Sequence, residues 1–195
     1  MNSKKLKTLG VSGILLINVS LAAGPGVDTA HATTTTSVPV LHRSIVFEAG
    51  FERYTSALEK ILGRFPAGVQ EDIIKRPEVA EEKLKAAQGA QQLMIFTVFD
   101  HGAALNMLNA PQHARQYLIG NPLTAIRMTH LDIRAALYAP LRVLVYGQGD
   151  RRTIVEYDQP SSQFGQFGRE DVTQVARTLD DKLARVLVQA GELAR

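Results

Sequence analysis

The sequence of 195 residues contains no cysteine and no tryptophan. Without cysteine, the chain cannot form a disulfide, a zinc–thiolate site, a c-type haem attachment, a thiol nucleophile or a lipidated cysteine anchor. An excess of one charge is also missing, because residues 33–195 contain 19 basic and 18 acidic side chains. No basic cluster is visible, so we expect no nucleic-acid partner. The hydrophobic fraction of 45% is sufficient for one domain with a core.

The usual signatures of catalysis and cofactor binding are missing too. No serine nucleophile elbow is present. The glycines at 147 and 149 lack the lysine and Ser/Thr of a phosphate loop, and a hairpin turn explains them. His101, His113 and His130 match no known metal-ligand spacing. We therefore predict no metal and no cofactor.

What the N-terminus does contain is the three-zone pattern of a secretory signal peptide over residues 1–32. Three lysines precede an apolar run at 11–23, and Ala30-His31-Ala32 fits the small-x-small cleavage rule. An uncleaved membrane anchor is the alternative, but a span needs ~20 mostly apolar residues. We expect cleavage near Ala32, which predicts a bacterial protein in the periplasm or secreted, with no membrane attachment afterwards.

Residues 33–41 are rich in threonine and are expected to form a disordered tether. Residues 42–195 then read as one domain. Apolar runs and turn residues predict strands at 42–48, 93–99, 115–119, 141–146 and 153–157. Helical spacing predicts helices at 51–62, 78–90, 103–108, within 123–137, and a long C-terminal one at 172–190. The polar, glycine-rich stretch 161–168 is expected to be a loop.

Several motifs follow one another at a spacing that resembles one known family. They are Phe99-Asp100-His101, Leu118-Ile119-Gly120-Asn121-Pro122, Ile133 to Leu137, Pro140 to Tyr146, and Tyr157-Asp158-Gln159-Pro160. With these motifs, residues 43–188 resemble a DUF302 domain, a bacterial family of unassigned function. The resemblance implies an α+β fold: a single small sheet, mostly antiparallel, with helices packed on it, often self-associating. Residues 65–92 depart from the family pattern by adding a second helical segment.

Asp100-His101 is the strongest candidate for chemistry. An aspartate beside a histidine at a strand end can orient the imidazole for proton transfer or metal binding. Alternatively, Asp100 caps the following helix and His101 packs at the sheet edge. Adjacent residues on a strand point to opposite faces, which favours this structural interpretation.

Two further motifs are candidate parts of a ligand site. Gly120-Asn121-Pro122 could present backbone amides to an anion, although such a tripeptide is more typical of a turn. Tyr157-Asp158 could add a hydroxyl and a carboxylate, or simply end a strand. We expect these residues and Asp100-His101 to gather in one shared concavity at the strand tips.

Three functions remain open at this point. The favoured one is a non-catalytic envelope protein that binds an unknown small molecule or an envelope-protein partner through this site. A hydrolase- or lyase-like enzyme with Asp100 and His101 as acid/base is an alternative. A structural module that forms a homodimer is the other.

Overall fold

The computed structural model describes residues 32–195, which fall into two units, one ending at Val38 and the other spanning Pro39–Arg195. The predicted signal peptide lies outside the described residues except for Ala32. Residues 32–41 form no helix or strand. None of the helices in the described part of the chain is long and apolar enough to cross a membrane.

The domain is built on one open sheet with the strand order β1-β6-β5-β4-β3-β2. All neighbouring strands are antiparallel except β2 and β3, which are parallel. The prediction of an α+β fold with a single, mostly antiparallel sheet is confirmed. The strands are β1 (His42–Phe47), β2 (Gly63–Arg64), β3 (Met94–Asp100), β4 (Ala114–Gly120), β5 (Leu141–Gln148) and β6 (Arg152–Asp158).

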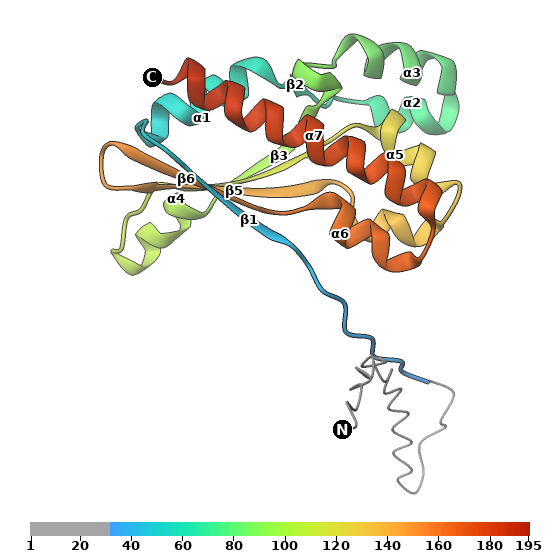
Figure 1. Ribbon diagram of the computed structural model, residues 1–195. Helices are drawn as coiled ribbons and strands as arrows, with labels where there is room; N and C mark the ends of the chain where they lie inside the picture. The colour runs from blue at the N-terminus through green and yellow to red at the C-terminus, as the bar shows by residue number, and fades with distance from the viewer. Residues whose placement is uncertain (1–31) are drawn as a thin grey trace, which may run out of the picture. The chain divides into compact units, whose positions relative to one another are not determined.

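Most helices lie on one side of this sheet, where α7 crosses the strands beside α1 (Figure 1). The helices are α1 (Phe51–Ile61), α2 (Val69–Lys75), α3 (Pro77–Ala86), α4 (His101–Leu105), α5 (Pro122–Thr129), α6 (Pro160–Phe164) and α7 (Glu170–Leu193). Short 3₁₀ segments are η1 (Ala90–Gln92), η2 (Asn106–Leu108), η3 (Ile133–Tyr138) and η4 (Gly165–Phe167).

The core forms between the sheet and the apolar stripes of α1 and α7. Tyr54 and Leu58 of α1 and Leu183 and Leu187 of α7 are fully buried, as their helical spacing predicts. The Tyr54 hydroxyl donates a hydrogen bond of 3.0 Å to the Leu187 carbonyl oxygen, which satisfies the polar end of this buried ring. The predicted C-terminal helix is therefore confirmed, and it is the main cover of the sheet.

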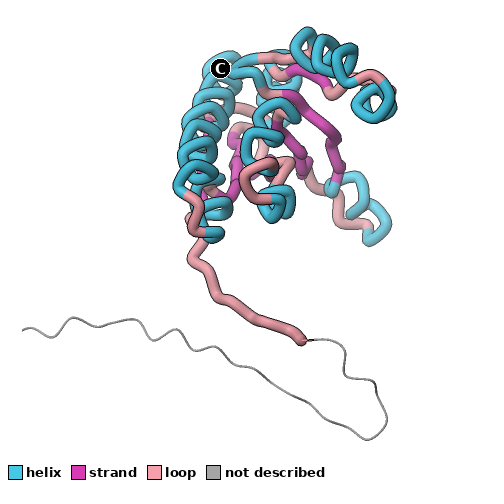
Figure 2. Tube along the Cα trace, turned by 90° about the vertical axis from the view of Figure 1, so that its right-hand side faces the viewer, coloured by secondary structure: helices cyan, strands magenta, loops and turns pink. Residues whose placement is uncertain are grey.

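The opposite side of the sheet, which we call the open face, carries the alternate residues of the same strands. Val46 of β1 and Phe99 of β3 are 54% and 51% exposed there, and Arg142 of β5 is exposed as well. Helix α4 projects from the end of β3 on the side away from α7 (Figure 2). Much of the open face is thus solvent-accessible in the isolated chain.

Residues 65–92 are largely helical, as predicted, and form α2 and α3 with a small core of their own. Val69, Ala80, Leu84 and Met94 make up this core. The buried Asp72 carboxylate accepts hydrogen bonds from Lys83 and Arg76, which hold its pKa below the usual range. β2, a two-residue strand that leads into this segment, was not predicted from the sequence.

One element of the sequence prediction is wrong. The stretch 161–168 is not a loop, because Pro160–Phe164 form α6 and Gly165–Phe167 a 3₁₀ turn. Pro160 occupies the first helical position, where its missing N–H costs nothing. The ring of Phe164 is fully buried beneath the helix layer, and this burial holds the polar stretch in place.

Candidate functional site

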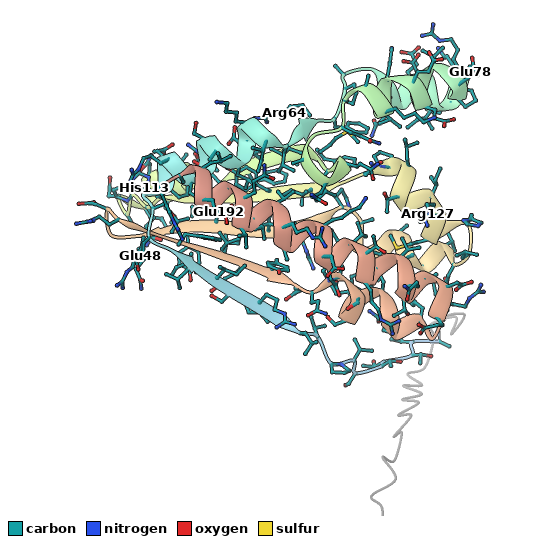
Figure 3. All side chains as sticks on the ribbon, turned by 45° about the horizontal axis from the view of Figure 1, so that its top comes forward. Glu48, Arg64, Glu78, His113, Arg127 and Glu192 are labelled. Atoms are coloured by element: carbon teal, nitrogen blue, oxygen red, sulfur yellow. The ribbon has the colours of Figure 1, made fainter. Side chains whose placement is uncertain are left out.

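The predicted site residues fall at two opposite ends of the sheet. β3 and β4 are antiparallel, with Asp100 opposite Arg115 at one end and Met94 opposite Gly120 at the other. Six residues of strand separate these positions, about 20 Å at ~3.3 Å per residue. We name them the α4 end and the α5 end; Figure 3 shows His113 and Glu48 near the first and Arg127 near the second. The expectation of one shared concavity is therefore wrong.

At the α4 end, the carboxylate of Asp100 has a structural task. The Ala103 N–H donates a hydrogen bond of 2.7 Å to Asp100 Oδ1, so Asp100 is the N-cap of α4. Its Oδ2 lies 3.7 Å from Arg115 Nε on the neighbouring strand. The helix-capping interpretation of this residue is confirmed.

His101 is exposed at the first position of α4. Within residues 32–195, its imidazole forms no hydrogen bond and no ion pair. Tyr157 lies on β6, three strands away from β3 in the sheet order, so its hydroxyl is not a partner of His101. The geometry of the described residues therefore gives no support to an acid/base pair at His101.

Arg115 is a residue that sequence reasoning missed. Its guanidinium donates a hydrogen bond of 2.9 Å to Thr55 Oγ1, approaches Glu52 at 3.3 Å and lies 5.1 Å from the Phe51 ring centroid. These contacts fasten β4 to the first turn of α1. A single arginine in a strand carries no sequence signal for such a role, because its partners lie about 60 residues earlier.

At the α5 end, Asn121 turns the chain from β4 into α5. Its side-chain oxygen accepts a hydrogen bond of 2.8 Å from the Leu123 N–H, and its amide donates one of 2.8 Å to the Gln92 carbonyl oxygen. Pro122 follows at the first helical position. The turn interpretation of Gly120-Asn121-Pro122 is confirmed, and Asn121 is 6% exposed.

The same turn forms one wall of an apolar pocket of about 200 Å³, which we name the corner pocket. β3, α5, the bend into β5, α6 and α7 all contribute to it. Thr124 and Asn121 supply the only polar side chains of its lining, and both polar atoms of Asn121 already have partners. The lining residues are Phe96, Gly120, Asn121, Pro122, Thr124, Ala125, Met128, Ala139, Pro140, Leu141, Phe164 and Leu179.

Tyr157 and Asp158 are adjacent residues of β6 and face opposite sides of the sheet. Tyr157 is 7% exposed on the helix side, and burial raises the pKa of its hydroxyl. Asp158 lies on the open face, where its Oδ1 is 3.0 Å from Nδ1 of His42. Consequently, the two residues cannot act together on one ligand.

Asp158 lines a second pocket of about 170 Å³, which we name the open-face pocket. Pro140 separates it from the corner pocket, since this residue lines both. Its lining is mixed, with Arg142, Asp158 and Gln163 next to Leu118, Leu137, Tyr138 and Pro140. The two pockets differ in character because they open on different faces of the sheet.

The His, Asp and Glu side chains of residues 32–195 are the available metal ligands, since the sequence has no cysteine. In this part of the chain, no three His, Asp or Glu side chains are grouped as a metal ion requires. His42 comes nearest, with Asp158 at 3.0 Å and Glu156 at 3.6 Å from its two ring nitrogens. Because each nitrogen faces a carboxylate, the arrangement is that of an ion pair.

Comparison with known proteins places the chain in a family. The model of DUF302, a domain of unknown function, matches residues 70–190. The chain belongs to the DUF302 family. It is similar to the crystal structure of an uncharacterized conserved DUF302 protein from Bacillus stearothermophilus, with a TM-score of 0.54 and 14% sequence identity. The similarity covers 76% of this chain and 97% of the other, and it shows a shared fold. No curated protein matches.

The family match places both pockets inside the DUF302 region. Every lining residue of the corner pocket and of the open-face pocket lies between residues 70 and 190. β1 and α1 precede the matched region. The pockets are therefore built from the part of the chain that defines the family.

Proposed function

We propose that this DUF302 domain is an exported, non-catalytic protein that binds a small, neutral, apolar ligand in the corner pocket. The observation that carries the proposal is the pocket itself. Small-molecule sites are concave and lined mostly by apolar side chains, with few polar groups. A hollow of about 200 Å³ with an almost wholly apolar wall is therefore a site that a ligand can fill.

The chemistry of the lining supports binding over catalysis. None of the lining residues carries a titratable side chain, so the pocket offers no acid or base. The Asn121 amide is held by Leu123 and Gln92, and the Thr124 hydroxyl is the remaining side-chain group for polar contact. The contacts available to a ligand are almost all van der Waals contacts, which select for shape and for low polarity.

The volume sets the size of the ligand. Pockets for drug-sized ligands run from about 300 Å³ upward, whereas an apolar cavity of about 150 Å³ is sufficient for benzene. The corner pocket lies between these values. A single aromatic ring or a short branched chain fits it, and indole is a suitable probe.

Indole binding, measured by saturation-transfer NMR, tests the proposal. Ala125→Leu places a larger side chain in the corner pocket and should weaken binding at least about tenfold, because the ligand loses its space. Ala184→Leu is the matched control, since Ala184 is a half-buried helical alanine that does not line this pocket. Equal binding by the Ala125→Leu variant would contradict the proposal, as would no binding of indole or benzene at millimolar concentration.

Export is supported by the signal-peptide pattern of residues 1–32 and needs its own measurement. Mass spectrometry of the full chain expressed in a bacterium should find the N-terminus at Thr33 in the periplasmic or culture fraction. An intact Met1 on cytoplasmic protein would contradict export and leave the pocket proposal unaffected. Homodimer formation and an envelope-protein partner stay predictions, and light scattering at micromolar concentration checks the first.

A further inference from the structure

The open-face pocket contains a positive and a negative group on neighbouring strands. Arg142 of β5 and Asp158 of β6 both face it, next to the register pair Val143–Tyr157. Within residues 32–195, the guanidinium of Arg142 forms no hydrogen bond or ion pair, whereas Arg134 is fastened to Asp132 and Arg169 to Asp171. Its five N–H donors are thus available at the pocket.

The carboxylate of Asp158 has unused capacity as well. Its Oδ1 faces His42 Nδ1 at 3.0 Å, while Oδ2 has only a long contact of 3.4 Å with Gln163 Nε2. A carboxylate offers about four lone-pair positions, so Oδ2 can accept a further charged donor. Gln163 is 7% exposed and held in α6, and it fixes this side of the pocket.

An apolar wall completes the pocket. Leu118 of β4, Leu137 of η3 and Pro140 line it together with the ring of Tyr138. That ring is held from behind by Phe164 and Phe167, with centroid distances of 6.1 and 5.9 Å. A ligand in the pocket therefore meets a positive group, a negative group and an apolar surface at once.

We propose that the open-face pocket binds a small zwitterion of the α-amino acid class with a short apolar side chain. The ligand carboxylate pairs with the planar guanidinium of Arg142, which matches carboxylate geometry in two parallel hydrogen bonds. The ligand ammonium donates to Asp158 Oδ2. The side chain lies on Leu118, Leu137 and Pro140, and the volume of about 170 Å³ limits it to roughly the size of valine.

The paired charges also give the selectivity. A monocarboxylate can pair with Arg142 but has no ammonium group for Asp158. An amine can pair with Asp158 but has no carboxylate for Arg142. Loss of either charged hydrogen bond should therefore weaken binding at least about tenfold. This proposal does not depend on the corner pocket, because Pro140 is the only residue that the two linings share.

Three ligands of matched shape test it on the full chain by isothermal titration calorimetry. L-valine should bind, while 3-methylbutanoate, which lacks the ammonium, and 2-methylpropylamine, which lacks the carboxylate, should each bind at least about tenfold more weakly. No heat with valine at millimolar concentration, or equal binding of 3-methylbutanoate, would overturn the proposal.

Variants locate the site. Arg142→Met should weaken the binding of valine at least about tenfold. Arg142→Lys should retain part of the affinity, because lysine keeps the positive charge but cannot form two parallel hydrogen bonds to the carboxylate. Arg151→Met removes an exposed arginine at the β5–β6 turn, at the α4 end, and is the matched control. Ala125→Leu should leave valine binding intact. Unchanged binding in Arg142→Met would place valine elsewhere and refute the assignment.

Discussion

The two ends of the sheet both contain polar residues where strands meet helices, but the corner pocket and the open-face pocket both lie at the α5 end. At the α4 end, Asp100 caps a helix and Arg115 fastens β4 to α1, so the charged groups are already engaged. At the α5 end, the chain leaves β4 through a buried turn, and two pockets lie on either side of Pro140. The contrast shows that a motif with charged or titratable side chains, such as Asp100-His101, can serve to join a strand to a helix instead of forming a functional site.

The largest expected effect tests how firmly each end is packed. Phe164→Ala at the α5 end removes a fully buried ring and should lower the free energy of unfolding by about 3–5 kcal/mol. Phe99→Ala at the α4 end removes a ring that is 51% exposed and should cost about 1 kcal/mol. Urea denaturation of both variants measures the difference. An equal loss would contradict the comparison and would show that Phe99 is covered in solution.

A smaller effect is expected at the turn into α5. Asn121→Ala removes both the helix cap and the hydrogen bond to Gln92, and should lower the free energy of unfolding by about 2 kcal/mol. Asn121→Ser keeps a capping oxygen and should recover about half of that loss. Thermal unfolding of the two variants separates the contributions. If serine recovers nothing, the bond to Gln92 rather than the cap stabilises this end.

The corresponding change at the α4 end should be milder. Asp100→Ala removes the cap of the short α4 and should cost about 1 kcal/mol. Asp100→Asn retains the capping oxygen and loses only an exposed ion pair with Arg115, which should cost under about 0.5 kcal/mol. Urea denaturation again measures both. A loss in Asp100→Asn as large as in Asp100→Ala would assign the role of this residue to its charge.

The smallest effect is a pH dependence at the α5 end. The hydrogen bond to Asp158, followed by the charge of Glu156, raises the pKa of His42 above its ordinary 6.5. Folding therefore favours the protonated imidazole, and this stabilisation is complete below pH 6.5 and disappears as the pH rises through the raised value. His42→Gln should flatten this part of the curve of melting temperature against pH.

The control for that measurement lies at the other end. His101→Gln removes an exposed histidine that has no carboxylate partner among the described residues, so the change with pH near neutrality should persist. If His101→Gln and His42→Gln change the pH dependence of the melting temperature equally, the effect does not come from the pair of His42 and Asp158.

The sequence predicted most of the fold because apolar periodicity reflects burial. The strands around Val143 and Val155 and the stripe of α7 that includes Leu183 were found this way, since each places apolar side chains on one face. α6 was missed because its residues are polar and glycine follows them. Its position depends on the burial of Phe164, a tertiary contact that has no local pattern.

The site was harder to predict because function depends on which strand ends meet. Asp100 ends β3 and Asn121 follows β4, yet antiparallel pairing places these two strand ends at opposite ends of the sheet. Arg142 was overlooked for a different reason. It alternates with buried valines and leucines, so it reads as an ordinary solvent-facing residue of β5. Only the position of Asp158 on the next strand gives it a candidate role.

The pairing of the first strand with the last has a consequence for how the domain is completed. His42 pairs with Asp158, which lies 116 positions later in the chain. The Tyr54 hydroxyl donates its hydrogen bond to Leu187, 133 positions later. Contacts of such separation slow folding, because the entropy of closing a long loop is lost before they form. β1 has no neighbour in the sheet until β6 has been synthesised. The sheet of a partly synthesised chain therefore lacks its first edge strand, which stays unpaired until nearly the whole domain is available.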